Sequence, residues 1–204
     1  MEWDDIRRRR RTTRSFSSDP VPPDVLDRIL DAGRRGPSAG FSQGSDFVVL
    51  EGPDQTRVFW ETTTDARWRS STRRHAGTLS VPVIVIPLAD AGAYTKRYAE
   101  ADKAGSGLDR AEAWPVPYWL IDTSFAAMLI QLAAINEGLG VFFFGIFRGE
   151  SELKAHLGIP PDRMPIGALA MGWAAPDSGA DEPASPSLAR GRRPRSDVIH
   201  RRVW

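Results

Sequence analysis

Apolar residues recur at the helical period in several stretches of the chain. A proline-rich turn precedes one such stretch, which predicts a helix that ends at Gly36. A longer and more apolar helix is predicted over 125–138, with N-cap candidates at 122–124. Shorter helices are predicted over 3–10 and 150–156. The apolar face of the helix before Gly36 consists of Val25, Leu26, Ile29 and Leu30.

Four short apolar runs have the composition of buried strands. The run over 81–88 is almost wholly apolar and rich in β-branched residues, which is typical of a central strand covered on both faces. Pro82 and Pro87 are expected to mark its ends. Since helices mix with buried strands and no internal repeat or boundary is visible, we expect one domain over 1–204 of the α/β or α+β class. The other predicted strands cover 47–50, 141–147 and 166–173.

Two segments show neither the helical period nor the apolar runs of buried strands. Residues 89–118 are irregular and aromatic, as in a lid or binding loop, and 174–204 forms a C-terminal extension that starts with a Pro-, Ala- and Ser-rich stretch. The aromatic residues of the first segment are candidates for stacking on a ligand, and hydrophobic core or dimer interface is the alternative. These residues are Tyr94, Tyr98, Trp114, Tyr118 and Trp119.

Composition removes several classes of chemistry. The chain has no cysteine, which excludes disulfides, thiolate catalysis and thiolate-bound metals, and its three scattered histidines make a metal site unexpected. A formal net charge of +1 gives no global basic field for nucleic acid. The first residues lack the apolar run of a signal peptide, and polar residues and glycines interrupt the most apolar stretch. We therefore expect a soluble, cytoplasmic protein.

Arginine gathers near both ends of the chain. The sequence RRTTR occupies 10–14, and a second cluster contains Arg190, Arg192, Arg193 and Arg195. Two arginines four residues apart, with hydroxyl groups between them, suit a phosphate because arginine donates charge-assisted, bidentate hydrogen bonds. A solvated, flexible chain end is the alternative interpretation.

The segment GPSAGFSQG over 36–44 is the second candidate for ligand binding. Its small residues allow a flat ligand to approach the backbone, and Ser38, Ser42 and Gln43 offer polar groups to the edge of a heterocycle. An ordinary loop after a helix is the alternative. Neither a GxGxxG motif after a strand nor a GxxxxGK[ST] loop is present, so Rossmann and P-loop nucleotide sites are not supported.

In this order, these segments resemble the nitroreductase family of FMN enzymes. RRTTR is similar to the family's RRS-x-R motif, and PSAGFSQ is similar to PS-x-x-N-x-Q. An apolar helix ending in EGLG, a strand that runs into a glycine-containing turn, and a basic RGRRP follow. The resemblance covers nearly the whole chain. It implies an α+β fold with a mixed sheet flanked by helices and a C-terminal extension, and a homodimer with two FMN sites at its interface.

The resemblance also implies roles for individual residues. The phosphate and ribityl chain of FMN are expected to contact Arg10, Arg11, Thr12 and Arg14 together with Arg190 and Arg192. The loop that reaches the flavin from the partner subunit contains Pro37, Ser38, Ala39, Phe41 and Gln43. The flavin ring is expected to be lined near N5 by Gly145, Ile146 and Phe147, and its pyrimidine edge to be reached by Arg73. Two positions depart from the family pattern. Phe41 stands where asparagine is usual, and 146–148 lacks the acidic residue that is common after this strand.

The implied reaction transfers hydride from NAD(P)H through FMN to a small acceptor such as a nitroaromatic or a quinone, in alternating half-reactions. The flavin carries the chemistry, so no catalytic acid or base and no metal is assigned. A dehydrogenase or dehalogenase on the same fold is an alternative. An anionic-polymer binder that uses the arginine-rich ends is another, and the near-neutral total charge argues against it. The sequence leaves the acceptor and the choice between NADH and NADPH open.

Overall fold

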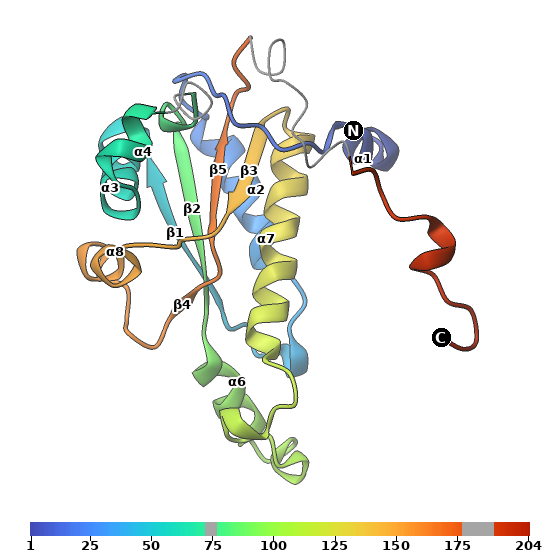
Figure 1. Cartoon of the computed structure of the whole chain (residues 1–204). Coiled ribbons are helices and arrows are strands. Elements are labelled where there is room, and N and C mark those ends of the chain that lie inside the picture. The colour runs from blue at the N-terminus through green and yellow to red at the C-terminus, as the bar shows by residue number, and fades with distance from the viewer. Residues whose placement is uncertain (72–76, 177–189) are drawn as a thin grey trace.

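A single sheet forms the centre of the protein, in a computed structural model that describes residues 1–71, 77–176 and 190–204. Its strand order is β1-β2-β5-β3, with β4 paired to the end of β2 (Figure 1). All four strand pairings are antiparallel, and an isolated bridge joins Thr12 to Val141 in parallel. The predicted α+β class is confirmed. The strands are β1 (Ser45–Glu51), β2 (Val83–Ala89), β3 (Gly140–Phe144), β4 (Met164–Pro165) and β5 (Ala168–Gly172).

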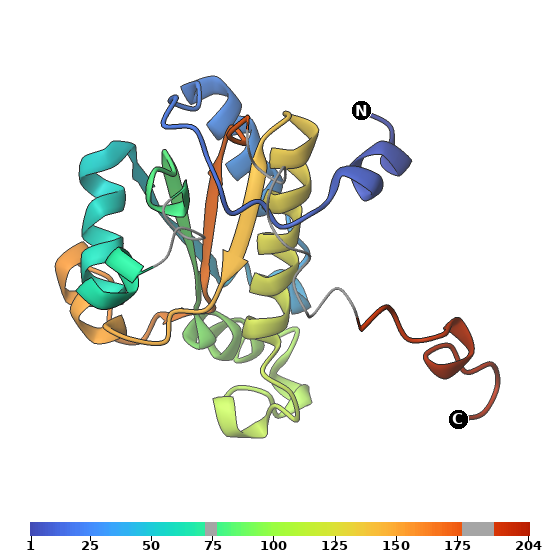
Figure 2. The same cartoon turned by 45° about the horizontal axis from the view of Figure 1, so that its top comes forward.

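Helices cover both faces of this sheet. α2 and α7 pack on one face, whereas α3 and α8 lie on the other (Figures 1 and 2). The α-helices are α1 (Trp3–Arg9), α2 (Pro23–Arg34), α3 (Gly52–Thr63), α4 (Ala66–Ser71), α6 (Ala91–Tyr98), α7 (Tyr118–Asn136) and α8 (Glu150–Leu157). The described residues also contain four single-turn 3-10 helices: η1 (Ala39–Phe41), η2 (Ala104–Ser106), η3 (Ala111–Ala113) and η4 (Arg195–Asp197).

β2 is the central strand that its composition predicts. All seven of its residues are buried. Because side chains alternate along a strand, Val85 packs in one core cluster with Ile130 of α7, while Ile84 and Ile86 pack in the other with Phe59 of α3. The continuous apolar run therefore fills two cores at once.

α7 is apolar on nearly all sides. Ile130 and Ala134 are fully buried, yet Phe125 and Met128 on the same helix are 50% and 44% exposed. Among the described residues it is the one helix long and apolar enough to cross a membrane, by length and composition only. Its packing against α2 and the sheet is that of a core helix.

The structure confirms Pro82 as the residue before β2 but corrects the predicted end at Pro87. Pro87 lies inside this strand, where its register partner on β1 is Phe47. On the other side of β2, β4 ends at Pro165 and β5 begins at Ala168, and Ile166 donates its N–H to the Pro87 carbonyl oxygen at 3.1 Å. Proline is tolerated here because the ladder beside it is interrupted.

Three other boundaries also differ from prediction. α7 begins at Tyr118 after the N-cap residue Pro117, so the predicted N-cap residues 122–124 lie inside the helix. The segment predicted to be irregular contains α6, capped by the Asp90 side chain, which accepts from the Ala93 N–H at 3.2 Å. β3 ends at Phe144, three residues before the predicted end.

The two ends of the chain are placed differently. After α1, the N-terminal segment crosses the start of β3, whereas the C-terminal segment with η4 extends away from the body of the protein (Figures 1 and 2). Each residue from Arg190 to Trp204 is exposed.

Candidate functional site

Backbone contacts hold the RRTTR segment against the edge strand β3. Thr12 forms a bridge with Val141, and the Thr13 N–H donates to the Val141 carbonyl oxygen at 3.0 Å. Gly140 makes this approach close, since a Cβ at that position would lie 2.6 Å from Thr13 Cγ2. On the far side of the segment, the Thr78 hydroxyl donates to the Arg14 carbonyl oxygen at 2.6 Å. These contacts therefore hold the backbone of the segment in place, although its arginine side chains are not packed in an apolar core.

The arginines of this segment are free of acidic partners. Arg7 and Arg8 on α1 pair with aspartates one turn away, but Arg10, Arg11 and Arg14 make no ion pair within the described ranges. The Arg14 guanidinium lies 5.1 Å from the ring centroid of Phe142, a cation–π contact. Unpaired guanidinium groups on a fixed backbone suit the phosphate of a ligand.

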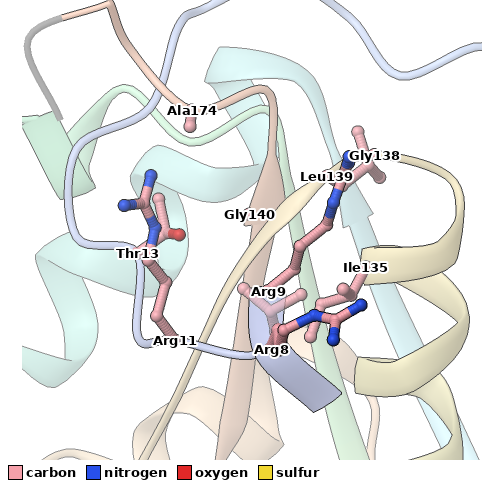
Figure 3. A pocket seen from close by; sticks show the side chains of 10 residues that line it. Arg8, Arg9, Arg11, Thr13, Ile135, Gly138, Leu139, Gly140 and Ala174 are labelled. Carbon is pink, nitrogen blue, oxygen red and sulfur yellow. The ribbon is translucent and has the colours of Figure 1, made fainter. Parts of the chain in front are cut away.

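A pocket of about 420 Å³ opens beside this segment. Figure 3 shows that the guanidinium groups of Arg8, Arg9 and Arg11 point in different directions around it. The pocket lies toward the core cluster of Val141, while Arg14 lies over Phe142, which packs in the opposite cluster. The pocket therefore contains Arg11 but not Arg10, Thr12 or Arg14. Its lining is Arg8, Arg9, Arg11, Thr13, Ile135, Gly138, Leu139, Gly140, Val141 and Ala174.

The turn after β3 carries the residues expected near the flavin ring. Phe147 is 92% exposed, and its ring covers the Gly145 backbone so closely that a Cβ on Gly145 would lie 2.6 Å from Phe147 Cζ. Ile146 is half-buried against the core. β3 is an edge strand whose outer side pairs with Thr12 and Thr13 only at Val141, so the outer edge beyond Val141 and the turn that continues it can face a ligand.

An ion pair fixes the end of this turn. Arg148 Nη1 lies 2.5 Å from Asp65 Oδ2, on the connection between α3 and α4. The Trp68 N–H also donates to Asp65 at 2.6 Å, and this bond together with Arg148 lowers the pKa of the Asp65 carboxyl. The basic residue that departs from the family pattern thus has a structural partner.

The second predicted motif, the loop over 37–43, lies at the other end of α7 (Figure 1). The Ser38 hydroxyl accepts the Gln43 N–H at 2.9 Å, so part of its capacity is used inside the loop. Phe41 is 74% exposed. The Ala39 N–H donates to Asp122 near the start of α7 at 2.8 Å, whereas RRTTR contacts the strand that follows the helix end. At 1.5 Å per residue, Asp122 and the end of α7 at Asn136 are roughly 20 Å apart.

The structure does not bring the remaining predicted residues to the RRTTR segment. Arg190 and Arg192 are exposed on the C-terminal segment that leads away from the body (Figure 1). Arg73 lies outside the described residues. No cluster of metal-ligating side chains occurs in the parts of the chain that the structure describes. One chain therefore places RRTTR beside the start of β3 and the turn over 145–147 after its end, and it holds the loop over 37–43 apart from RRTTR.

Sequence reasoning missed one buried group, Asp122. It is 5% exposed, and its Oδ2 accepts both the Ala39 N–H and, at 2.7 Å, the hydroxyl of Tyr94. Burial, followed by this carboxylate, raises the pKa of Tyr94. The aromatic residues predicted as lid or core include buried Tyr94, Trp114 and Trp119, which form a third core cluster. An acidic residue inside an apolar run was the available signal, but its position suggested an N-cap.

Comparison with known proteins assigns the family. The family model of the nitroreductase family matches residues 8–173, which is most of the chain and includes the first two predicted motifs and β3. The protein belongs to the nitroreductase family. It is therefore a flavin-dependent oxidoreductase, and FMN is the cofactor of its family.

Individual relatives are distant. A provisionally named NADH dehydrogenase/NAD(P)H nitroreductase of Methanothermobacter thermautotrophicus is 25% identical over 198 residues, which is 96% of this chain and 84% of the relative. Iodotyrosine deiodinase 1 of Rattus norvegicus is 36% identical over 54 residues, 26% of this chain and 19% of the relative. A nitroreductase family protein of Streptococcus pneumoniae has 19% identity, a TM-score of 0.71 and coverage of 98% and 100%.

A further solved structure contains a bound cofactor. It is a provisionally named nitroreductase of Exiguobacterium sibiricum in complex with FMN, with 17% identity, a TM-score of 0.70 and coverage of 98% of this chain and 97% of that one. At these identities the likeness shows a shared fold.

The residues of this chain fit FMN on their own chemistry. The unpaired guanidinium groups of Arg10 and Arg14 suit its phosphate, and the Thr12 hydroxyl lies between them in the sequence. The open edge of β3 and the turn at Gly145 leave backbone and an aromatic surface for a flat ring. This arrangement accommodates an anionic group at one end and a planar group at the other.

Proposed function

We propose that the chain is an NAD(P)H-dependent FMN oxidoreductase that reduces a small, flat electrophile such as a nitroaromatic or a quinone. One observation carries the proposal. Arg10, Arg11 and Arg14 lack acidic partners within the described residues while their backbone is fixed to β3. Cations held in this way favour a bound anion, because its charge replaces the missing ion pairs. Arg10, Thr12 and Arg14 would bind the FMN phosphate, and the turn from Gly145 to Phe147 would border the ring.

Bound FMN supplies the hydride transfer between NAD(P)H and the acceptor. The protein's part is to bind and orient. The exposed ring of Phe41 replaces a polar amide of the family pattern, and the exposed ring of Phe147 lies in the turn that lacks the family's acidic residue, so these two rings make the surface offered near the flavin more apolar. An apolar surface favours a flat hydrophobic acceptor over a charged one.

The proposal includes a homodimer formed by the whole chain, 1–204, as one FMN-binding domain. α7 exposes Phe125 and Met128, and Phe143 of β3 is 41% exposed. A helix that is apolar all round is normally covered. A second copy placed there would bring its own 37–43 loop toward the RRTTR edge, which removes the separation of roughly 20 Å along α7. A cytoplasmic location stays a prediction of the sequence.

The test starts from the purified protein. We expect a yellow preparation that releases FMN on denaturation, elutes as a dimer, and oxidises NADPH or NADH when a nitroaromatic or a quinone is added. Arg10→Ala is expected to weaken FMN binding by one or more kcal/mol, through loss of a charge-assisted bond. A colourless protein whose affinity for added FMN is unaffected by Arg10→Ala contradicts the proposal.

A dehalogenase is the second candidate. The 54-residue likeness to iodotyrosine deiodinase 1 favours it, although that match covers 26% of the chain. Release of iodide from an iodinated phenol by FMN-loaded protein with NADPH or NADH as the two-electron reductant, and no turnover of nitroaromatics or quinones, would select this function.

A further inference from the structure

The 37–43 loop has an unusual backbone. Phe41 and Gln43 have φ angles of 57° and 51°, and Gly40 has 62°. Positive φ at a residue other than glycine is strained, and such strain gathers at functional positions. Glycine and asparagine tolerate this region better than phenylalanine does. Surrounding contacts must therefore hold the loop in this form.

Two helices supply those contacts. Asp122 of α7 accepts the Ala39 N–H at 2.8 Å and the Tyr94 hydroxyl at 2.7 Å through the same oxygen. Arg97 of α6 donates from Nε to the Gly40 carbonyl oxygen at 2.9 Å. Arg97 is itself held by a bidentate contact to Asp102, with both distances 2.7 Å. We call Tyr94, Arg97 and Asp122 the loop clamp.

Stability alone does not explain this arrangement. Asp122 is 5% exposed and Tyr94 is fully buried, and Asp122 has no ion pair in the described parts of the chain. A buried carboxylate with two neutral donors is costly, and apolar residues of similar volume often serve stability as well or better. The contacts of Asp122 lead instead to the backbone of the strained loop, next to an exposed phenyl ring.

We infer that Asp122 is a positioning residue that holds the 37–43 loop so that Phe41 is presented to the flavin site of the second protomer. This inference rests on the proposed function and adds to it the origin of the loop geometry. Asp122 itself lies under the loop and does not face the ligand. Loss of the clamp would release the strain at Phe41 and Gln43, so the Phe41 ring would leave the position in which the loop presents it to the flavin site.

The experiment compares Asp122→Ala with Asp122→Asn. Alanine removes the acceptor for both donors, whereas the asparagine carbonyl oxygen can accept from Ala39 and Tyr94 as the carboxylate does. For FMN-loaded protein and a flat quinone acceptor, we expect Asp122→Ala to raise KM about tenfold or more and to change the visible circular dichroism of the flavin. Asp122→Asn should restore KM to within about threefold of the wild type, which is under 1 kcal/mol.

Thr56→Val is the matched control. Thr56 is 1% exposed and its hydroxyl donates to the Gly52 carbonyl oxygen at 3.1 Å, on α3 and away from the loop. This variant removes a buried hydrogen bond and leaves the loop clamp intact. If Thr56→Val raises KM as much as Asp122→Ala does, the effect follows stability and the inference is wrong. Tyr94→Phe removes one donor only and keeps the test open should Asp122→Ala fail to fold.

Hydrogen exchange of the cofactor-free protein separates this inference from the proposed function. The amide protons of 38–43 should exchange about tenfold or more faster in Asp122→Ala than in the wild type, since the Ala39 N–H loses its acceptor. Unchanged exchange overturns the clamp, whatever the activity. Faster exchange in a protein that neither binds FMN nor turns over a quinone upholds the clamp and overturns the proposed function.

Discussion

The two arginine-rich segments contain the same kind of side chain in opposite structural settings. RRTTR is hydrogen-bonded to Val141 and continues into Phe16, which is 3% exposed in the core. The segment from Arg190 onward is exposed throughout, and its η4 part extends away from the sheet in Figure 1. The comparison shows that arginine content alone does not determine where a segment lies in the fold. Backbone pairing with β3 and apolar neighbours fix the position of the first segment, whereas the second has neither of these among the residues that the structure describes.

The N-terminal cations should give the largest effect. Replacing Arg10 and Arg14 together by alanine is expected to weaken FMN binding by about 3 kcal/mol or more, because each charge-assisted bond contributes about 1.5 to 3 kcal/mol. Titration of the cofactor-free protein with FMN, followed by quenching of flavin fluorescence, measures this change. Arg7→Ala is the control, since Arg7 pairs with Asp4 on α1. Equal losses in the control and the double variant would remove the special role of 10–14.

Disturbing the backbone of the fixed segment should give an intermediate effect. In Gly140→Ala the new Cβ would lie 2.6 Å from Thr13 Cγ2. Overpacking of this kind costs about 1 to 3 kcal/mol, so urea unfolding should show that loss, with weaker FMN binding beside it. Adding Thr13→Ser removes the clashing methyl group and should recover part of both. Gly105→Ala meets no atom within 4 Å and should be neutral.

The C-terminal cations should give the smallest effect. The family resemblance implies a phosphate contact for Arg192, although one chain does not bring this residue to RRTTR, so Arg192→Ala is expected to weaken FMN binding by only about 1 kcal/mol. The urea midpoint of cofactor-free protein should stay unchanged, since the side chain is exposed. Arg201→Ala serves as the control in the same segment and should change neither quantity. Should the two variants have the same FMN affinity as the wild type, the C-terminal segment has no part in the phosphate site, and RRTTR alone binds it.

Much of the fold follows from the sequence pattern. The apolar run of β2 and the helical period before Gly36 are local signals, and both elements form where expected. The predictions were wrong where contacts between residues distant in sequence determine the local structure. Pro87 is tolerated inside β2 because β4 and β5 are interrupted beside it. Asp122 looked like an N-cap because its partners, Ala39 and Tyr94, are 83 and 28 residues away.

By itself, the sequence determined the residue types available for chemistry: two arginine clusters, a loop of small residues, and no cysteine. Tertiary structure decided which of them meet. It joined RRTTR to β3 through Gly140 and placed the 37–43 loop at the far end of α7. It also showed that a buried carboxylate supports that loop. The physical reason is range: local patterns follow from neighbours along the chain, whereas a site is defined by close approaches between segments that are distant in sequence.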